Sequence, residues 1–150
     1  MNRRTLTSTL AACALLIGTG FAVAQLATAA EAKAMLEKAV AALKANQADA
    51  LAKFNSPTGG FRDRDLYVFC FDMTTGKFNA HVNPALMGTD ARALKVSDQP
   101  VGQMVFDAAK EGTITTVDYN FPKPGTTTPV PKESFVTRVG NEGCGVGYYK

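Results

Sequence analysis

One segment, residues 65–90, most narrows what this chain can fold into. Residues 66–71 form a run of apolar, β-branched and aromatic side chains that is almost free of polar groups. Such a run is typical of a central strand that is buried on both faces. The turn sequence of residues 74–77 follows, and residues 78–82 then predict the return strand of a hairpin.

The hairpin also predicts which side chains share a face of the sheet. Symmetric closure about Thr75 and Gly76 places Cys70 opposite His81, the only histidine of the chain. Tyr67 and His81 then lie on opposite faces, unless a glycine bulge shifts the register by one residue.

The segments before and after this hairpin contain the predicted helices. Residues 29–55 carry apolar side chains at helical spacing, with an interruption at 46–49, and the breaker cluster of residues 56–60 ends the second, shorter helix. Residues 97–100, Ser-Asp-Gln-Pro, predict the capped start of another helix, and Gly112 predicts its end.

Three further strands are predicted over residues 113–121, 132–139 and 143–149, the last one rich in glycine. We expect those glycines to permit close packing of the backbone in a crowded strand. Helices followed by a hairpin, one more helix and three strands predict an α+β domain, with N-terminal helices packed on a five-stranded antiparallel sheet.

The N-terminus predicts export. Arg3 and Arg4 precede an apolar stretch over residues 10–23, and Ala22-Val23-Ala24 has the small-x-small pattern of a cleavage site. We therefore expect residues 1–24 to be a signal peptide and residues 25–150 to be one domain, periplasmic or secreted, with no membrane span after cleavage. A single membrane anchor is the alternative, although the stretch is short for a span.

The charge balance of the mature chain excludes some partners. Removal of Arg3 and Arg4 leaves 14 of the 16 basic side chains against 13 acidic ones. Because these two numbers are nearly equal, we expect no basic patch on the mature protein. We therefore expect no binding to nucleic acid or to a membrane surface.

Several motifs in order resemble the single Cache domain family of PAS-like extracytoplasmic sensors. They are residues 50–55 with Gly60-Phe61 and 65–69, residues 80–88 (AHVNPALMG), residues 119–125 (YNFPKPG), Lys132 with Phe135-Val136, and residues 145–149. The resemblance implies a PAS-like fold that binds a small ligand, here a short organic acid, with no cofactor and no catalysis. Phe121 stands where many members have tryptophan, and Phe135 where tyrosine is usual. With no module after Lys150, the resemblance implies a free-standing periplasmic member whose partner is a membrane sensor or transporter.

Five side chains are candidate ligand-binding residues: Tyr67, His81, Tyr119, Phe121 and Lys132. Tyr119 and Phe121 share a strand face and Lys132 begins the neighbouring strand, which makes a plausible cradle for a small organic anion. His81 is either a donor to a carboxylate or a structural histidine that bonds the loop backbone. Lys132 also has an alternative without a binding role: it is a surface lysine next to aromatic residues of the core.

Cys70 and Cys144 are the only cysteines of the predicted mature chain. In a PAS-like sheet the first and last strands are neighbours, so three states stay open: a disulfide, two buried inert thiols, or a functional thiol paired with His81. No metal site is predicted, because a second histidine is absent. The function alternatives are a ligand-free structural or assembly module and a thiol-disulfide protein. For the binding protein, we expect a pocket on one sheet face that residues 85–99 close.

We predict cleavage after Ala24, which leaves Gln25 at the N-terminus of the mature protein. Intact-mass spectrometry of a periplasmic fraction should give the mass of residues 25–150. Full-length chain recovered from membranes would instead support the anchored alternative.

Overall fold

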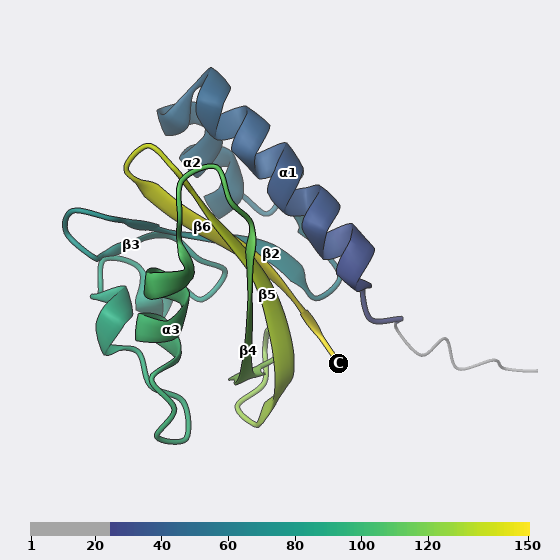
Figure 1. Ribbon diagram of the computed structural model, residues 1–150. Helices are drawn as coiled ribbons and strands as arrows, with labels where there is room; N and C mark the ends of the chain where they lie inside the picture. Colours follow the sequence, from purple (N-terminus) through teal and green to yellow (C-terminus); the bar gives the residue numbers. More distant parts are fainter. Residues whose placement is uncertain (1–24) are drawn as a thin grey trace, which may run out of the picture.

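The computed structural model describes residues 25–150, so the predicted signal peptide lies outside the described residues. The first two helices of the described residues lie against one face of a curved sheet (Figure 1): α1, Ala29–Ala45, and α2, Gln47–Asn55. Thr28 and Glu31 form a capping box at the start of α1, and Asn46 caps α2 by accepting the backbone N–H of Asp49. The interruption expected at 46–49 is therefore the junction of two helices.

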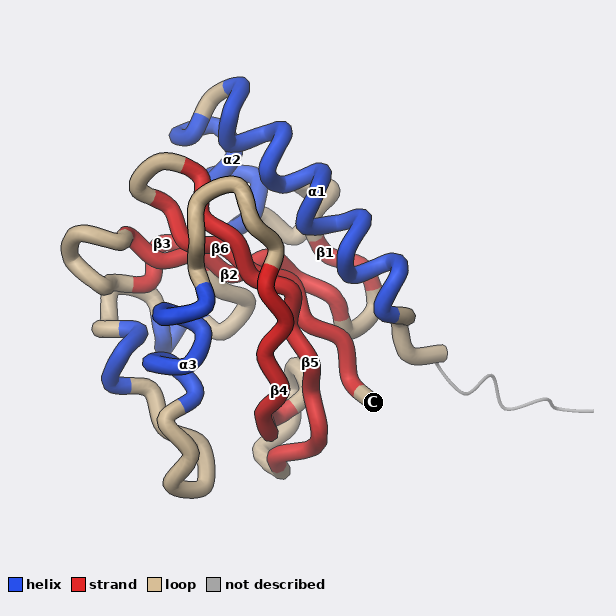
Figure 2. Tube along the Cα trace, in the orientation of Figure 1, coloured by secondary structure: helices blue, strands red, loops and turns tan. Residues whose placement is uncertain are grey.

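The sheet is antiparallel and has six strands, one more than the sequence predicted. They are β1 (Arg62–Asp63), β2 (Leu66–Asp72), β3 (Phe78–Ala80), β4 (Thr115–Pro122), β5 (Pro129–Val139) and β6 (Glu142–Tyr149). The order is β1-β2-β6-β5-β4, with β3 also paired to β2 (Figure 2). The additional strand, β1, has only two residues, which pair with the start of β2 through their backbones. A strand this short has no hydrophobic pattern from which it could be predicted.

Strand β2 separates the two hydrophobic cores of the domain. Its side chains alternate: Leu66, Val68 and Cys70 pack under α1 and α2, whereas Tyr67 and the two phenylalanines of the strand point to the other face. Burial on both faces confirms that residues 66–71 form a central strand. The second core lies between this other face and helix α3, Val101–Ala108.

Helix α3 starts and ends differently from the prediction. Ser97 and Asp98 have φ angles of 47° and 65°, so they form a left-handed turn before the helix rather than a cap. Pro100 occupies the N-cap position without a side-chain hydrogen bond, and the helix ends at Ala108, before Gly112. The reason is local: residues 96 and 99 bond each other through their backbones in a tight turn.

The hairpin register differs from the symmetric pairing. Asp72 and Lys77 close the turn, Phe71 pairs with Phe78, and a bulge then makes Ala80, not His81, the partner of Cys70. The Asp72 carboxylate fixes this turn by accepting the backbone N–H groups of Thr74 and Thr75. A shift by one residue changes the face of every side chain beyond it. His81 consequently lies on the face of Tyr67, and the predicted separation of these two residues is wrong.

Strands β2 and β6 are joined at their centre. Cys70 and Cys144 are paired across the two strands and form a disulfide on the face covered by α1 and α2. The opposite face of β6 presents glycines, and a Cβ at Gly143 or Gly145 would lie 2.3 or 2.4 Å from the rings of Phe71 and Phe69. The glycines therefore make room for the aromatic side chains of β2.

We predict that Cys70→Ala combined with Cys144→Ala lowers the free energy of unfolding by about 2–4 kcal/mol, because the bond closes a long loop in the unfolded chain. Urea unfolding followed by circular dichroism measures the loss. Dithiothreitol should destabilise the wild type by a similar amount and leave the double variant unchanged. Equal stability of the two proteins in oxidising buffer would contradict the prediction.

Candidate functional site

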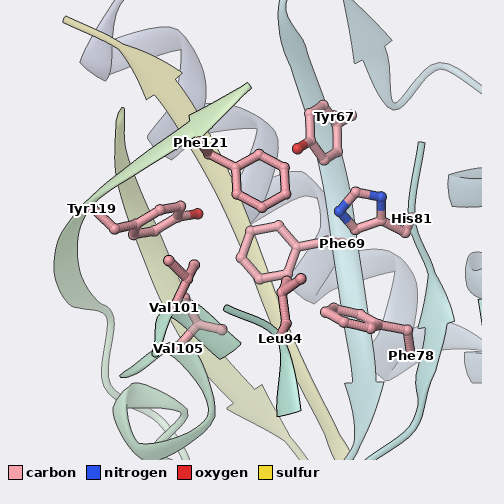
Figure 3. Close-up of a pocket in the computed structure, with 9 residues that line it drawn as sticks. All are labelled: Tyr67, Phe69, Phe78, His81, Leu94, Val101, Val105, Tyr119 and Phe121. Carbon is pink, nitrogen blue, oxygen red and sulfur yellow. The ribbon is translucent and has the colours of Figure 1, made fainter. Parts of the chain in front are cut away.

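A small pocket lies between the sheet and α3, on the face opposite the disulfide (Figure 3), and its free volume is about 20 Å³. We call it the inner chamber. Its walls are Tyr67, Phe69, Phe78, His81, Leu94, Val101, Val105, Tyr119 and Phe121. In this state it has room for a water-sized molecule and little more.

A wider hollow, with a free volume of about 370 Å³, adjoins the inner chamber. We call it the outer groove. It runs between residues 82–84, which follow β3, and residues 122–126 of the β4–β5 loop. Tyr67, His81 and Phe121 line both spaces, so their rings form the partition between them. The inner chamber and the outer groove therefore meet at these three rings.

His81 presents a hydrogen-bond donor at this partition. Its Nδ1 accepts the backbone N–H of Asn83 at 2.9 Å, so the neutral ring carries its proton on Nε2. Burial, followed by the positive charges of Lys132 and Arg62, lowers the pKa of His81 to about 3. The ring is thus neutral at physiological pH, and Figure 3 shows it turned toward the rings of Tyr67 and Phe69.

Lys132 lies behind the partition and does not line either space. The side chain is 2% exposed, and its Nζ donates to the Tyr67 hydroxyl at 2.9 Å. The ring centroids of Tyr67, Tyr149 and Phe121 lie 4.3, 4.9 and 5.2 Å from Nζ. Among residues 25–150 no carboxylate forms an ion pair with it. Burial lowers the pKa of Lys132 to about 7, and the charge of Asp65 opposes this only in part.

The hydroxyl of Tyr67 connects this ammonium group to the chamber. Its oxygen accepts from Lys132, so the hydroxyl can still donate its own proton, and Tyr149 is one side-chain neighbour within its reach. Burial raises the pKa of Tyr67 well above its usual value, so the group remains a protonated donor. Tyr119 adds a second hydroxyl, which bonds Ser134 at 2.6 Å.

A glycine in β6 makes the position of Lys132 possible. A Cβ at Gly147 would lie 2.4 Å from Cε of Lys132 and 2.3 Å from Oγ of Ser134. Lys132 is on β5, where it pairs with Tyr119 of β4 on one side and with Tyr149 of β6 on the other. Its aliphatic stem crosses β6 through the gap at Gly147. Any other residue at 147 would displace the ammonium group from its ring enclosure.

The inner chamber has one polar end and one apolar end. Tyr67 and His81 supply the polar atoms of one end, with the Lys132 ammonium group behind them, whereas Figure 3 shows Tyr119 beside Val101 and Val105. Leu94, Val101 and Val105 form the other end. No carboxylate contributes to the walls. Donors backed by a positive charge fit an anion with an apolar body.

The structure brings four of the five candidate residues to one chamber: Tyr67, His81, Tyr119 and Phe121. Lys132, the fifth, contacts two of them from behind. The wall differs from the expected one: of residues 85–99 only Leu94 lines the chamber, and α3 supplies the rest of that side. Val101 and Val105 are apolar residues at helical spacing, and such spacing alone does not distinguish a core face from a pocket wall.

Cys70 and Cys144 lie on the face away from the chamber, both fully buried and joined in the disulfide. The expected pairing of Cys70 with His81 is wrong, because the bulge in the hairpin places these side chains on opposite faces. Within residues 25–150 no cluster of three or more His, Cys, Asp or Glu side chains could hold a metal ion. In the same part of the chain, no helix combines the length and the apolar character that crossing a membrane requires.

Comparison with known families and structures agrees with the fold. Residues 22–149 match the family described as Single Cache domain 2. No curated protein matches the chain significantly.

Three solved structures share the fold, and each covers 80% of this chain. A methyl-accepting chemotaxis protein from Vibrio parahaemolyticus RIMD 2210633 has a TM-score of 0.66, at 22% identity over 86% of its length. The periplasmic sensor domain of a chemotaxis protein has a TM-score of 0.61, at 26% identity over 88% of its length. A Cache chemosensory domain, titled for its recognition of carboxylic acid, has a TM-score of 0.55, at 24% identity over 86% of its length.

We predict that Lys132→Met stabilises the protein at pH 6 by about 1–4 kcal/mol, because an apolar side chain of similar length replaces a desolvated charge. The pKa of Lys132 is lower in the folded than in the unfolded protein, so wild-type stability rises between pH 7 and about 10.5. The advantage of the variant should therefore shrink over that range. Urea unfolding at pH 6, 8 and 10 measures it. A destabilised variant at pH 6 would contradict the burial cost assigned here.

Proposed function

Because this chain belongs to the single Cache domain family, we propose that it is a periplasmic protein that binds or senses a small organic anion. The ligand is a short carboxylic acid of two or three carbons, and the inner chamber is its site. The mature protein comprises residues 25–150 under this proposal, after removal of residues 1–24.

The observation that carries the proposal is a buried ammonium group that forms no ion pair with a carboxylate of residues 25–150. Lys132 is enclosed by protein, and the rings around it supply only weak compensation for its lost hydration. A carboxylate at the polar end of the chamber would compensate the charge of Lys132, to which it would be connected through the hydroxyl of Tyr67. The three rings around Lys132 already contact its ammonium group. A ligand with an amino group would place a second positive charge nearby, which argues against an amine.

The binding geometry follows from the donors. One carboxylate oxygen would accept from Nε2–H of His81, and one from the hydroxyl of Tyr67, which Lys132 polarises from behind. Because a bound anion favours the charged amine, binding near pH 7 should be accompanied by proton uptake at Lys132. Lys132 is thus a positioning and charge-compensating residue in this proposal.

Ligand entry requires movement of the partition. The chamber is nearly filled in the described state, so an acid that arrives through the outer groove must displace the ring of Phe121 or Tyr67. Closure around the ligand would fix Leu94 and α3 against the sheet, and a partner would detect that change. A membrane sensor or transporter is the partner that suits a periplasmic sensor domain.

A catalytic role is not part of the proposal. His81 has a strongly lowered pKa, the chamber walls contain no serine, threonine or cysteine, and both cysteines of residues 25–150 are in the disulfide. The disulfide is fully buried, which disfavours a thiol-disulfide protein. A ligand-free structural module is the second candidate, and one observation favours it: the surroundings of Lys132 are already filled by the chain itself.

We predict that Lys132→Met weakens binding of acetate and propionate by about 1.5–3 kcal/mol, the scale of a hydrogen bond to a charged group, while the protein becomes more stable. Isothermal titration calorimetry at pH 6.5 measures the affinity. Lys123→Met, which removes the cation of the outer groove, is the matched control and should retain most of the affinity.

A thermal-shift screen of the mature protein against organic acids, amino acids and purines separates the two candidates. A bound acid at 100 times its Kd should add about 2.7 kcal/mol of stability. Stabilisation by purines or amines alone would contradict the proposed ligand class. No shift with any acid would favour the structural module.

A further inference from the structure

A tight turn places the carboxylate of Asp65 inside the protein. Only Arg64 and Asp65 join β1 to β2, and Arg64 takes a left-handed φ of 55°. The side chain of Asp65 is 8% exposed. Its Oδ1 accepts the backbone N–H of Ala27 at 2.8 Å, which attaches the segment just before α1 to the start of β2.

The other oxygen of this carboxylate has no such donor. Oδ2 of Asp65 is buried, and within residues 25–150 nothing forms a hydrogen bond with it. Arg64 directs its guanidinium to Glu31 and Asp63 instead. Lys132 is affected by the charge of Asp65, but these two side chains form no ion pair in this part of the chain. A buried carboxylate oxygen without a donor is costly, so a positively charged donor would be bound favourably there.

A hollow with a free volume of about 280 Å³ lies beside this carboxylate, and we call it the N-terminal hollow. Its walls are Gln25, Leu26, Arg64, Asp65 and Pro124. Gln25 comes two residues before Ala27, whose N–H the carboxylate already accepts. Two residues span at most about 7 Å, so a local change of the chain inside the hollow brings the nitrogen of Gln25 to Oδ2. Nearby nitrogens of one backbone segment often surround a single anion in this way.

We propose that the carboxylate of Asp65 is a site for a primary ammonium group, and that the α-amine of Gln25 occupies it once residues 1–24 have been removed. Hydrolysis of the bond between Ala24 and Gln25 consumes one water: its hydroxyl goes to the Ala24 carbonyl, and its hydrogen goes to the nitrogen of Gln25. The new amine then takes up a proton from solvent at neutral pH. This inference rests on the cleavage site of the proposed function, and it gives the new terminus a role.

The ion pair would make the domain sensitive to its own processing. An amide nitrogen at Gln25 carries no charge, so this residue supplies a counter-ion for Asp65 only in the processed chain. Pro124 lines both the N-terminal hollow and the outer groove. The occupied site would therefore hold the new terminus against the β4–β5 loop, which forms one side of that groove.

The alternative counter-ion is Lys132, whose pKa the charge of Asp65 raises. Its Nζ donates to Tyr67, and the ammonium group would balance the carboxylate only from a distance. In that case the α-amine of Gln25 stays in solvent and reacts like that of an unstructured peptide. The reactivity of this amine therefore distinguishes the two arrangements.

The experiment measures how fast the α-amine of Gln25 is acylated at pH 7. The full chain is expressed, the processed protein is isolated from the periplasm, and its intact mass identifies the first residue. An N-hydroxysuccinimide ester then labels the amines, and mass spectrometry of the N-terminal peptide gives the rate. Asp65→Asn removes the charge but keeps an oxygen for the N–H of Ala27. Asp63→Asn, which removes the neighbouring exposed carboxylate, is the matched control.

Acylation of the α-amine should be about ten-fold slower in the wild type and in Asp63→Asn than in Asp65→Asn. An ion pair raises the pKa of the amine, and each unit reduces the reactive, unprotonated fraction at pH 7 by about ten-fold. Should Asp65→Asn fold poorly, wild type unfolded in urea replaces it as the fast reference. Equal rates in wild type and reference overturn the inference, and so does slow acylation that persists in folded Asp65→Asn.

Cyclisation of Gln25 gives a second measurement on the same samples. The α-amine of an N-terminal glutamine can attack its own side-chain amide and release ammonia, which intact mass detects. A protonated amine held in an ion pair is not a nucleophile, so the wild type should cyclise more slowly than Asp65→Asn. Equally fast cyclisation in both proteins overturns the inference.

Failure of the cleavage site and failure of acid binding have different signatures. A processed protein that begins at another residue overturns this inference, because Gln25 then has no α-amine. Calorimetry with acetate tests the acid-binding function on the same preparation. Loss of acetate binding alone leaves the expected acylation rates unchanged, so slow acylation in such a protein still supports the ammonium site.

Discussion

The arrangement of this domain depends on one desolvated charge. The ammonium group of Lys132 lies inside the sheet face, bonded to Tyr67 and enclosed by rings, and the charge of Asp65 compensates for its burial only in part. Gly147 is required because the lysine stem occupies the space of a side chain in β6. Burial of His81 lowers the pKa of that ring, and the nearby charge of Lys132 lowers it further, so the ring stays a neutral donor.

The sheet separates stability from binding. One face of β2 carries the disulfide and packs under α1 and α2, whereas the other face carries the chamber. Period-two alternation along six residues is sufficient to produce this division. The covalent link and the apolar core under the helices can therefore support a chamber whose own electrostatics are unfavourable in the absence of an anion.

Much of this fold was predictable from the sequence, and the exceptions have physical causes. The central strand, the two N-terminal helices and the glycine-rich last strand carry strong patterns over many residues. The register of the β2–β3 hairpin does not, because the carboxylate of Asp72 and one bulged residue decide it. That single shift moved His81 to the face of Tyr67. The candidate residues were recognised as a group, but their geometry, with Lys132 acting through Tyr67, required the structure.

The burial of Lys132 has an evolutionary consequence. A residue that weakens the fold while it supplies a binding charge is maintained only as long as selection acts on binding. Once that selection is relaxed, apolar replacements at this position increase stability and accumulate by drift, and the constraint on Gly147 disappears with them. Descendants of this domain that no longer bind an anion should therefore carry a recognisable mark: a methionine or leucine in place of the lysine, and a side chain in place of the glycine.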